Sequence, residues 1–221
     1  MTTVKTSRAY SSTVRDEQAA RTRGRILDAA AELFLSQGYG ATTIKAIADR
    51  ADVARDTVHA VFGNKARVLT ALLDQRLVPD GSVENVRGRP ESQAIKDEPD
   101  QRRQIERLAT FLAGLSTELR PVFEVLRTAS AVEPEMRAVL TEMDGYRMRN
   151  MQGYVKWIAA NGPLRISTKR AGETLWALAS LDVARLLCDD LGWSEAQHAR
   201  WLADALVRTL LPDVEDERPR P

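Results

Sequence analysis

Apolar residues recur at steps of three and four along most of the chain, which is the spacing of one face of an α-helix. The first such stripe begins after Arg21 and runs through Ile26, Ala30 and Phe34, and Gly38 predicts its end. Alternating runs typical of strands are few, and aromatic residues are only 5% of the chain, a low share for a protein built from sheets. The pattern therefore predicts an all-α fold.

Two short helices and a longer one are predicted after the first stripe. Thr42 is expected to open the first short helix, and the tripeptide from Ala51 to Val53 to break the chain. A second short helix is expected over residues 55–61, and Asn64 is a suitable N-cap for a longer helix that ends near Leu77. Two short helices joined by a three-residue turn indicate a helix-turn-helix.

Residues 79–99 differ from the rest of the chain, because they contain three prolines, two glycines and few apolar residues. We expect a loop or linker here, and a structureless connection of this length is usually mobile or functional.

Helical stripes return beyond residue 100. Pro121 is expected to interrupt the first of them, because proline lacks a backbone N–H. Pro134 is expected to open a long helix, because proline suits the first turn. The predicted helices cover residues 105–119, 122–131, 134–160, 168–191 and 194–210.

The net charge of +1 hides an asymmetry along the chain. Residues 1–78 carry a net +4 and residues 79–221 a net −3, and the basic excess lies within residues 1–25. A basic arm before a helical domain is a common feature of nucleic-acid-binding proteins, although a solvated tail has the same composition. The predicted organisation is a flexible basic arm (1–20), a helix-turn-helix domain (21–64), a helical body (65–211, with the linker at 79–99) and a tail (212–221).

The second short helix has the two faces that a DNA-reading helix needs. Val58 and Phe62 are expected to face the core, whereas Arg55 can donate two parallel hydrogen bonds to a guanine. The first backbone N–H groups of the neighbouring helices, near Thr42 and Lys65, are natural phosphate sites. The predicted DNA-binding residues are Thr42, Thr43, Lys45, Arg55, Asp56, Thr57, His59, Ala60 and Lys65.

Many spaced positions between Arg25 and Lys65 agree with one known pattern. They are Arg25-Ile26-Leu27-Asp28-Ala29-Ala30, Leu33-Phe34, Gly38-Tyr39, Thr42-Thr43-Ile44, Ile47-Ala48, Val53 to His59 and Phe62-Gly63-Asn64-Lys65. This stretch resembles the N-terminal domain of the TetR family of one-component transcriptional regulators.

Four positions depart from the family pattern. Asp52 stands where glycine is usual, and Ala54 where serine or threonine caps the helix. His59 replaces the usual tyrosine, and Val61 replaces the usual aromatic residue or histidine. These departures affect individual phosphate contacts and leave the motif in place.

The resemblance implies a sequence-specific regulator of the cytoplasm that acts as a homodimer on a palindromic operator of double-stranded DNA. Because a protein bound to DNA excludes the polymerase, repression is the expected outcome, and a small-molecule ligand is expected to release the protein from DNA. Family members pair through their last two long helices. The residues expected at such a dimer interface are Leu181, Leu186, Trp193, Trp201, Leu202 and Leu206.

Methionines and aromatic residues are frequent in the C-terminal half, and most of them are expected in the core. A fraction is expected to line a ligand cavity, because methionine adapts to irregular shapes and aromatic rings give flat apolar walls. A polar ligand group has Arg127, Arg147 or Asp182 as possible partners. The predicted pocket residues are Phe111, Leu115, Phe123, Met143, Tyr146, Trp176 and Asp182.

Other classes of protein fit the sequence less well. The single Cys188 excludes a disulfide framework, and two histidines leave little for a metal site, so we expect no metal, cofactor or catalytic residue. An all-α enzyme or small-molecule carrier with an incidental helix-turn-helix is the alternative, but the acids of the C-terminal half show no spacing tied to a histidine or cysteine. A non-specific architectural DNA binder is a third hypothesis, and the near-neutral charge after residue 25 argues against it. His198 is expected at the surface or at an interface.

No segment reads as a signal peptide or a membrane span. The first twenty residues lack an apolar run, and the most apolar window, 175–188, is interrupted by Asp182 and Arg185. The expected location is the cytoplasm.

Overall fold

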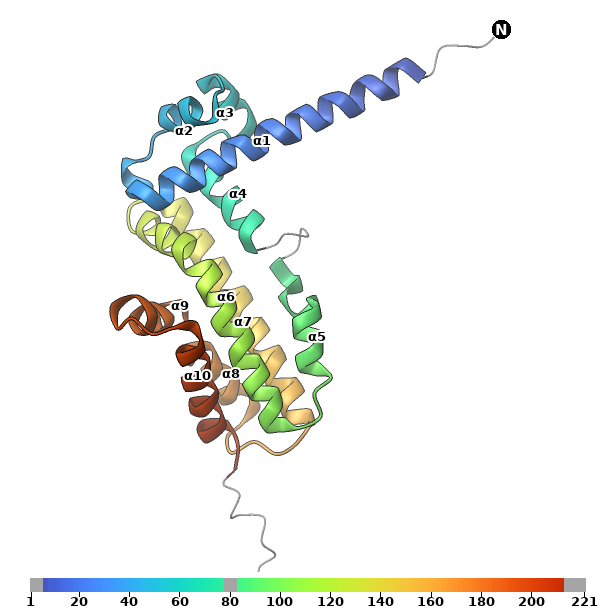
Figure 1. Ribbon diagram of the computed structural model, residues 1–221, viewed down its shortest axis with the longest axis vertical. Coiled ribbons are helices and arrows are strands. Elements are labelled where there is room, and N and C mark those ends of the chain that lie inside the picture. The colour runs from blue at the N-terminus through green and yellow to red at the C-terminus, as the bar shows by residue number, and fades with distance from the viewer. Residues whose placement is uncertain (1–5, 78–82, 213–221) are drawn as a thin grey trace, which may run out of the picture.

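The computed structural model describes residues 6–77 and 83–212, and every element in those ranges is helical (Figure 1). The all-α prediction is confirmed. Residues 1–5 of the predicted arm and 213–221 of the predicted tail lie outside the described residues. The elements are α1 (Thr6–Ala41), α2 (Ile44–Ala51), α3 (Arg55–Phe62), α4 (Lys65–Leu77), η1 (Val83–Gly88), α5 (Pro90–Lys96), α6 (Gln101–Ser130), α7 (Pro134–Ala160), α8 (Thr168–Leu178), α9 (Leu181–Ala184), η2 (Arg185–Asp190) and α10 (Glu195–Leu210).

Helix α1 is longer than the apolar pattern indicated. It begins at Thr6 instead of Arg21, so the described part of the predicted arm is helical and extends away from the rest of the molecule (Figure 1). The segment before Arg21 has no apolar stripe, and a helix that buries no face leaves no periodic signal in the sequence. Gly38 has φ 79° and kinks the helix near its predicted end.

The helix-turn-helix is formed by α2 and α3. Thr43, not Thr42, caps α2, because the Thr43 side chain accepts a hydrogen bond from the backbone N–H of Ala46. The turn depends on Asp52, which adopts the left-handed conformation (φ 52°, ψ 54°) that glycine usually supplies. Together with α1, these helices form what we call the head.

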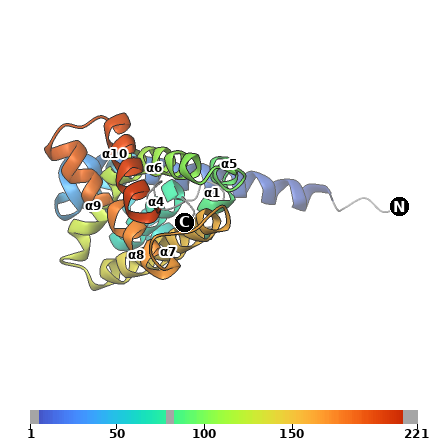
Figure 2. The same cartoon turned by 90° about the horizontal axis from the view of Figure 1, so that it is seen from below.

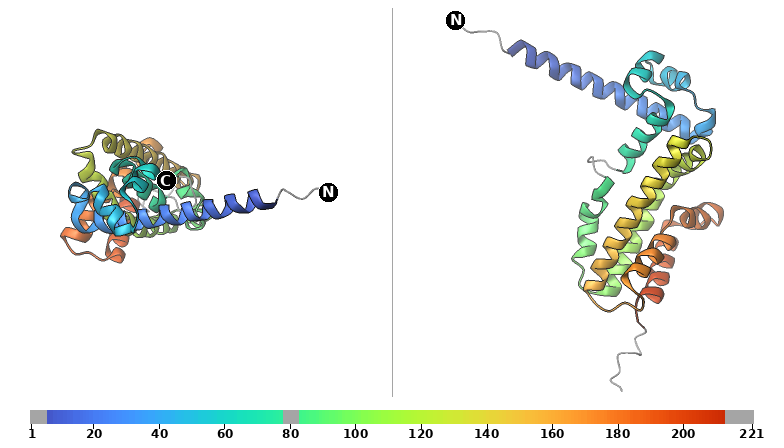
Figure 3. Two further views of the ribbon diagram at one scale, coloured as in Figure 1. Left: turned by 90° about the horizontal axis from the view of Figure 1, so that it is seen from above. Right: turned by 180° about the vertical axis from the view of Figure 1, so that it is seen from behind.

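The prediction of a linker over residues 79–99 is wrong for its described part. Residues 83–88 form η1 and residues 90–96 form α5, which lies along α7 (Figure 3). Pro90 occupies the first turn of α5, where its missing N–H costs nothing. Ile95 is 3% exposed, and the Ser92 hydroxyl lies 2.8 Å from that of Tyr154.

Pro121 does not end a helix, so the expected break in the C-terminal half is also wrong. Helix α6 continues through it to Ser130. A proline inside a helix costs about 3 kcal/mol. Burial on both sides of Pro121 offsets that cost, since Leu112 and Ala113 before it and Val122 and Leu126 after it are all buried.

The helix predicted over 168–191 is divided in three. Helix α8 ends at Leu178, and Ser180 caps α9 by accepting a hydrogen bond from the N–H of Val183. The chain then continues as the π-helical turn η2. By contrast, the expected start of the last helix is confirmed, because Ser194 and Gln197 form a capping box at α10.

Two hydrophobic cores hold the molecule together. The first joins the head and α4 to the end of α6 and the start of α7, and contains Phe34, Val58, Leu69 and Leu126. The second joins α5, α8 and α10 to the other ends of α6 and α7. Figure 2 views the helices from this end of the molecule. Helix α4 therefore shares its core with the head.

Candidate DNA-binding head and ligand cavity

Helix α3 is held in place from both sides. Val58 is fully buried and Phe62 is 5% exposed, so one face of α3 packs into the first core. On the other side of the turn, Arg50 of α2 forms an ion pair with Glu32 of α1, with 2.8 Å between Nε and Oε2. The Arg25 guanidinium of α1 also donates to the carbonyl of Asp52 at 3.4 Å. These contacts fix the orientation of α3 relative to α1.

The opposite face of α3 carries the residues predicted to meet DNA. Arg55, Asp56, His59 and Ala60 are exposed, and Thr57 is half-buried. Among the described residues, Arg55 has no hydrogen bond or ion pair, so all of its guanidinium donors are available. A free guanidinium at the start of such a helix can bind the edge of a guanine.

His59 is more constrained than the others on this face. Its Nδ1 lies 2.8 Å from the carbonyl oxygen of Gly63, which can only accept, so Nδ1 carries the proton. The other ring nitrogen, Nε2, is left as an acceptor in this tautomer.

The predicted DNA-binding residues outside α3 differ in whether their side chains are free to contact DNA. Thr42 is 1% exposed and its hydroxyl donates to the carbonyl of Gly38 at 2.8 Å, so this side chain is occupied within the head, and the predicted phosphate contact by backbone N–H groups near Thr42 stays a prediction. Thr43 is exposed and caps α2. Lys45 is also exposed and lies 2.6 Å from the carboxylate of Asp49.

Lys65 lies at the junction of the head and the body. Its ammonium donates to the carbonyl of Tyr39 at 2.9 Å and lies 4.0 Å from the centre of the Tyr39 ring. Burial lowers the pKa of Lys65, and the nearby Glu133 carboxylate opposes that shift. The Tyr39 hydroxyl lies 3.4 Å from Glu133, and burial together with this carboxylate raises the pKa of Tyr39. Contact between Lys65 and phosphate stays a prediction, because one of its three donors is already used.

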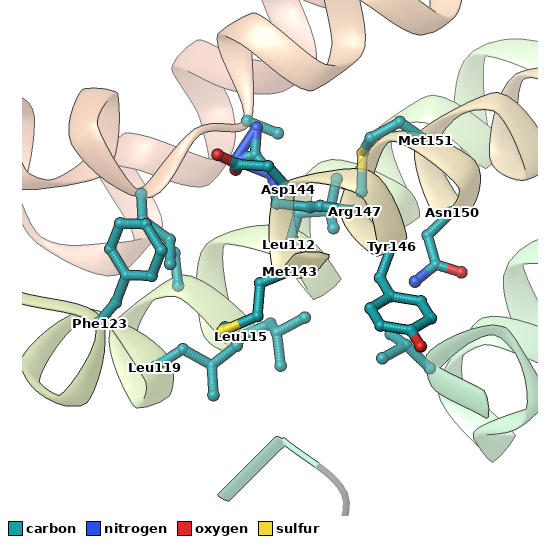
Figure 4. Close-up of a pocket in the computed structure, with 14 residues that line it drawn as sticks. Leu112, Leu115, Leu119, Phe123, Met143, Asp144, Tyr146, Arg147, Asn150 and Met151 are labelled. Carbon is teal, nitrogen blue, oxygen red and sulfur yellow. The ribbon is translucent and has the colours of Figure 1, made fainter. Parts of the chain in front are cut away.

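A cavity lies where the two cores meet, between η1, α6, α7 and the α8–α9 junction (Figure 4). The volume of this cavity that water can enter is about 100 Å³. Four of the predicted pocket residues line this cavity: Leu115, Phe123, Met143 and Tyr146. The wall is completed by Val86, Leu112, Ser116, Leu119, Asp144, Arg147, Asn150, Met151, Ala179 and Leu181.

Three predicted pocket residues lie elsewhere. Phe111 faces a separate groove between α5 and α6. Trp176 does not line the cavity and packs against Arg147, whose guanidinium carbon is 4.6 Å from the ring centre. Asp182 is exposed. These positions depend on how the helices rotate against one another, which a stripe of apolar residues does not specify.

Three polar residues of α7 lie on the cavity wall, of which the sequence analysis named Arg147 as a possible ligand partner but did not name Asp144 or Asn150. Asp144, Arg147 and Asn150 follow one another at steps of three, opposite the leucines of α6 (Figure 4). Burial raises the pKa of Asp144 and lowers that of Arg147, and each charge counteracts the shift of the other. The polar side chains at a helical interval within a long helix were the only available signal.

The residues expected at the dimer interface differ in their exposure in the structure. Leu202 and Leu206 are fully buried within the second core, so the expectation that they face a partner is wrong. Leu181 lines the cavity. Leu186 is 48% exposed, and Trp193 and Trp201 are half-buried and meet edge to face with 6.5 Å between ring centres. The exposed large apolar residues of this region are therefore Leu186 and Leu191, and the two tryptophans are exposed only in part.

The two residues with thiol or imidazole groups in the body show different burial. Cys188 is half-buried in η2. His198 is 2% exposed, which corrects the expected surface position.

None of the helices in the described ranges is long and apolar enough to cross a membrane.

The head and the whole fold have known counterparts. Residues 26–72 match the family described as "Bacterial regulatory proteins, tetR family". YvkB, an uncharacterized HTH-type transcriptional regulator of Bacillus subtilis, is 45% identical over 62 residues, which are 28% of this chain and only 33% of YvkB. The HTH-type transcriptional activator FasR of Mycolicibacterium smegmatis is 26% identical over 193 residues, covering 87% of this chain and 68% of FasR.

The similarity in structure extends beyond the head. The crystal structure of NalD, the secondary repressor of the MexAB-OprM multidrug efflux pump in Pseudomonas aeruginosa, superposes with a TM-score of 0.67 at 24% identity. It covers 89% of this chain and 99% of NalD, so the body shares that fold. Regulators of the tetR family are not enzymes, as the sequence predicted for this chain. Residues 26–72 thus carry the helix-turn-helix domain of the tetR family of bacterial regulatory proteins, and the fold of the whole described chain is similar to that of NalD.

Proposed function

We propose that the protein is a ligand-released repressor that binds a palindromic operator as a homodimer. The observation that carries this proposal is the outer face of α3, where an unpartnered Arg55 stands among exposed polar or small residues while Val58 and Phe62 anchor the helix behind it. Such a helix can enter the major groove with its first residues on the base edges.

A second copy supplies the second reading helix. The exposed Leu186 and Leu191, together with the half-buried Trp193 and Trp201, support pairing through η2 and α10. Two α3 helices one turn of DNA apart, about 34–36 Å, then read two halves of a symmetric site. Occupation of a promoter by such a dimer excludes RNA polymerase.

The cavity supports control by a small molecule. It lies between the core that contains the head and the core that contains α10, so a ligand that changes its size changes how the two cores sit against each other. Helix α4 is the connection, since it packs in the head core and is followed by η1, whose Val86 lines the cavity. A coupling of about 1–3 kcal/mol changes affinity for DNA about 5–150-fold.

Selection of bound DNA from a random pool by the purified protein tests the proposal. We expect an enriched sequence with two inverted half-sites, and a complex with the mass of two chains on one duplex. Enrichment of no symmetric sequence contradicts the proposal.

The sign of regulation needs a separate measurement. FasR is named an activator and NalD a repressor. A reporter gene placed behind the selected site should fall in expression when the protein is present, whereas a rise identifies an activator.

A further inference from the structure

The polar groups on the cavity wall differ in whether they already form hydrogen bonds within the protein. Asn150 accepts a hydrogen bond from Nε of Arg87 at 3.2 Å, and the Ser116 hydroxyl donates to the carbonyl of Ala113 at 2.8 Å. The Tyr146 hydroxyl lies 3.1 Å from a carboxylate oxygen of Glu142. The Asn150 carbonyl oxygen, the Ser116 hydroxyl and the Tyr146 hydroxyl therefore each have one hydrogen-bond partner within the protein.

Arg147 is also committed to the protein. Its Nη2 donates to the carbonyl of Trp176, and the guanidinium stacks on the ring of the same residue. Its Nε has no partner but is buried, so that N–H does not reach the space inside the cavity. The cation of Arg147 is thus held against the α8 wall.

Asp144 is the exception. It lines the cavity and is half-buried, and among the described residues its carboxylate has no hydrogen bond and no ion pair. The nearest charges that act on it are those of Arg147 and Asp182. Asp182 is exposed and outside the cavity, so Asp144 is the only carboxylate among the residues that line it, and it is the charged group of the wall that the described residues leave without a hydrogen bond or ion pair.

The rest of the wall is apolar and adaptable. Leu112, Leu115 and Leu119 form one side, and the flexible side chains of Met143 and Met151 lie on the other (Figure 4). An occupant must therefore be lipophilic over most of its surface and must satisfy one carboxylate at its polar end.

We infer that the cavity takes a lipophilic molecule that carries one protonated amine, and that Asp144 is the residue that binds its nitrogen. This inference rests on the proposed function, because it names the class of ligand for the same cavity. A charged partner for Asp144 replaces the solvation that burial removes from the carboxylate, which an alcohol does only in part and a carboxylate ligand does not do at all.

Three compounds with the same apolar part test the inference by isothermal titration calorimetry at pH 7.5. They are 4-phenylbutylamine, 4-phenylbutan-1-ol and 4-phenylbutanoate. Because a hydrogen bond to a charged group is worth about 1.5–3 kcal/mol, the amine should bind about tenfold or more tightly than the alcohol, and the carboxylate more weakly than both.

Two variants assign the preference to one carboxylate. Asp144→Asn keeps the shape of the side chain and should remove the advantage of the amine while leaving the alcohol within about twofold of its original affinity. Asp182→Asn is the matched control, because Asp182 is exposed and does not line the cavity. It should change amine binding by less than about threefold, since exposed charges are screened.

The outcomes separate this inference from the proposed function. Leu115→Trp fills the cavity and should abolish binding of all three compounds. If the alcohol binds, Leu115→Trp blocks it, and the amine has no advantage, then the cavity is a ligand site and the inferred class is wrong. Retention of the amine preference in Asp144→Asn also overturns the inference. If none of the compounds binds, both the inferred class and the ligand-responsive part of the proposed function fail.

Discussion

The guanidinium of Arg87 lies over the backbone of Gly153, in the space that a side chain at position 153 would occupy. A Cβ built on Gly153 would be 2.6 Å from Cζ and 2.8 Å from Cδ of Arg87. From this position Arg87 donates to Asn150 on the cavity wall, and its guanidinium carbon lies 6.0 Å from the centre of the Trp157 ring. The glycine in α7 therefore makes room for the contact that ties η1 to the cavity.

A double-mutant cycle between these two residues measures that contact. Alanine inside a helix is favoured over glycine by about 1 kcal/mol. In an Arg87→Ala background, Gly153→Ala should therefore raise the free energy of unfolding by about 1 kcal/mol. In the original background it should raise it less, or lower it, because the guanidinium must move away. Urea unfolding of the four proteins gives the coupling energy, and equal effects in both backgrounds would show that Arg87 does not depend on the glycine.

Arg55→Ala should weaken binding of the selected DNA by about 1–3 kcal/mol and broaden the preference at one base pair of each half-site. The reason is that Arg55 has its full set of donors free at the start of α3. Repeating the selection with the variant measures both effects. Arg102→Ala is the matched control, because Arg102 is an exposed arginine near the start of α6, outside the head, and its loss should leave the base preference as it was. An unchanged preference in Arg55→Ala would remove Arg55 from the residues that read bases.

The head could be predicted from the sequence because its signals are local. The apolar positions, the cap before α4 and the turn at Asp52 each depend on residues within a few positions of one another. Asn64, predicted as that cap, accepts a hydrogen bond from the N–H of Arg67 at 2.8 Å. Local chemistry was therefore sufficient for the elements that carry α3.

The body was predicted less well because its decisive contacts are distant in sequence. Helix α6 continues through Pro121, with residues before and after it buried in the two cores against distant parts of the chain, and η1 and α5 are held by contacts such as Ser92 with Tyr154. The cavity wall likewise depends on the rotation of α7 against α6, which brings Asp144 and Asn150 inward. These features depend on packing between helices, and the periodicity of apolar residues within one helix does not predict that packing.

Lys65→Ala should separate two roles of the same ammonium. If Lys65 contacts phosphate, the variant weakens binding to all DNA sequences alike and reduces the slope of log affinity against log salt concentration by about one unit. Loss of its contacts with Tyr39 should in addition lower the stability of the junction with the body. A salt titration of DNA binding and urea unfolding measure the two effects. Lower stability with an unaltered salt slope would restrict Lys65 to the junction.

His198 should make the folded protein sensitive to mild acid. The side chain is buried, neither ring nitrogen has a hydrogen-bond partner among the described residues, and its nearest charges are Arg120 and Glu195. Burial and then Arg120 lower the pKa of His198 in the folded state, whereas Glu195 opposes the shift. In the unfolded chain the pKa is near the ordinary value of about 6.5.

Whether acid raises or lowers the stability depends on which state, folded or unfolded, binds more protons. Below about pH 6.5, His198 binds a proton in the unfolded chain but stays neutral in the folded protein. The free energy of unfolding therefore falls as the pH is lowered, by up to about 1.4 kcal/mol per pH unit, until the pH reaches the pKa of His198 in the folded state. His198→Leu should remove this part of the pH dependence and leave stability at pH 7.5 equal or higher, because it removes a buried polar ring without partners. Urea unfolding of both proteins between pH 5 and pH 7.5 measures the difference. Parallel stability curves across that range would show that His198 titrates alike in both states.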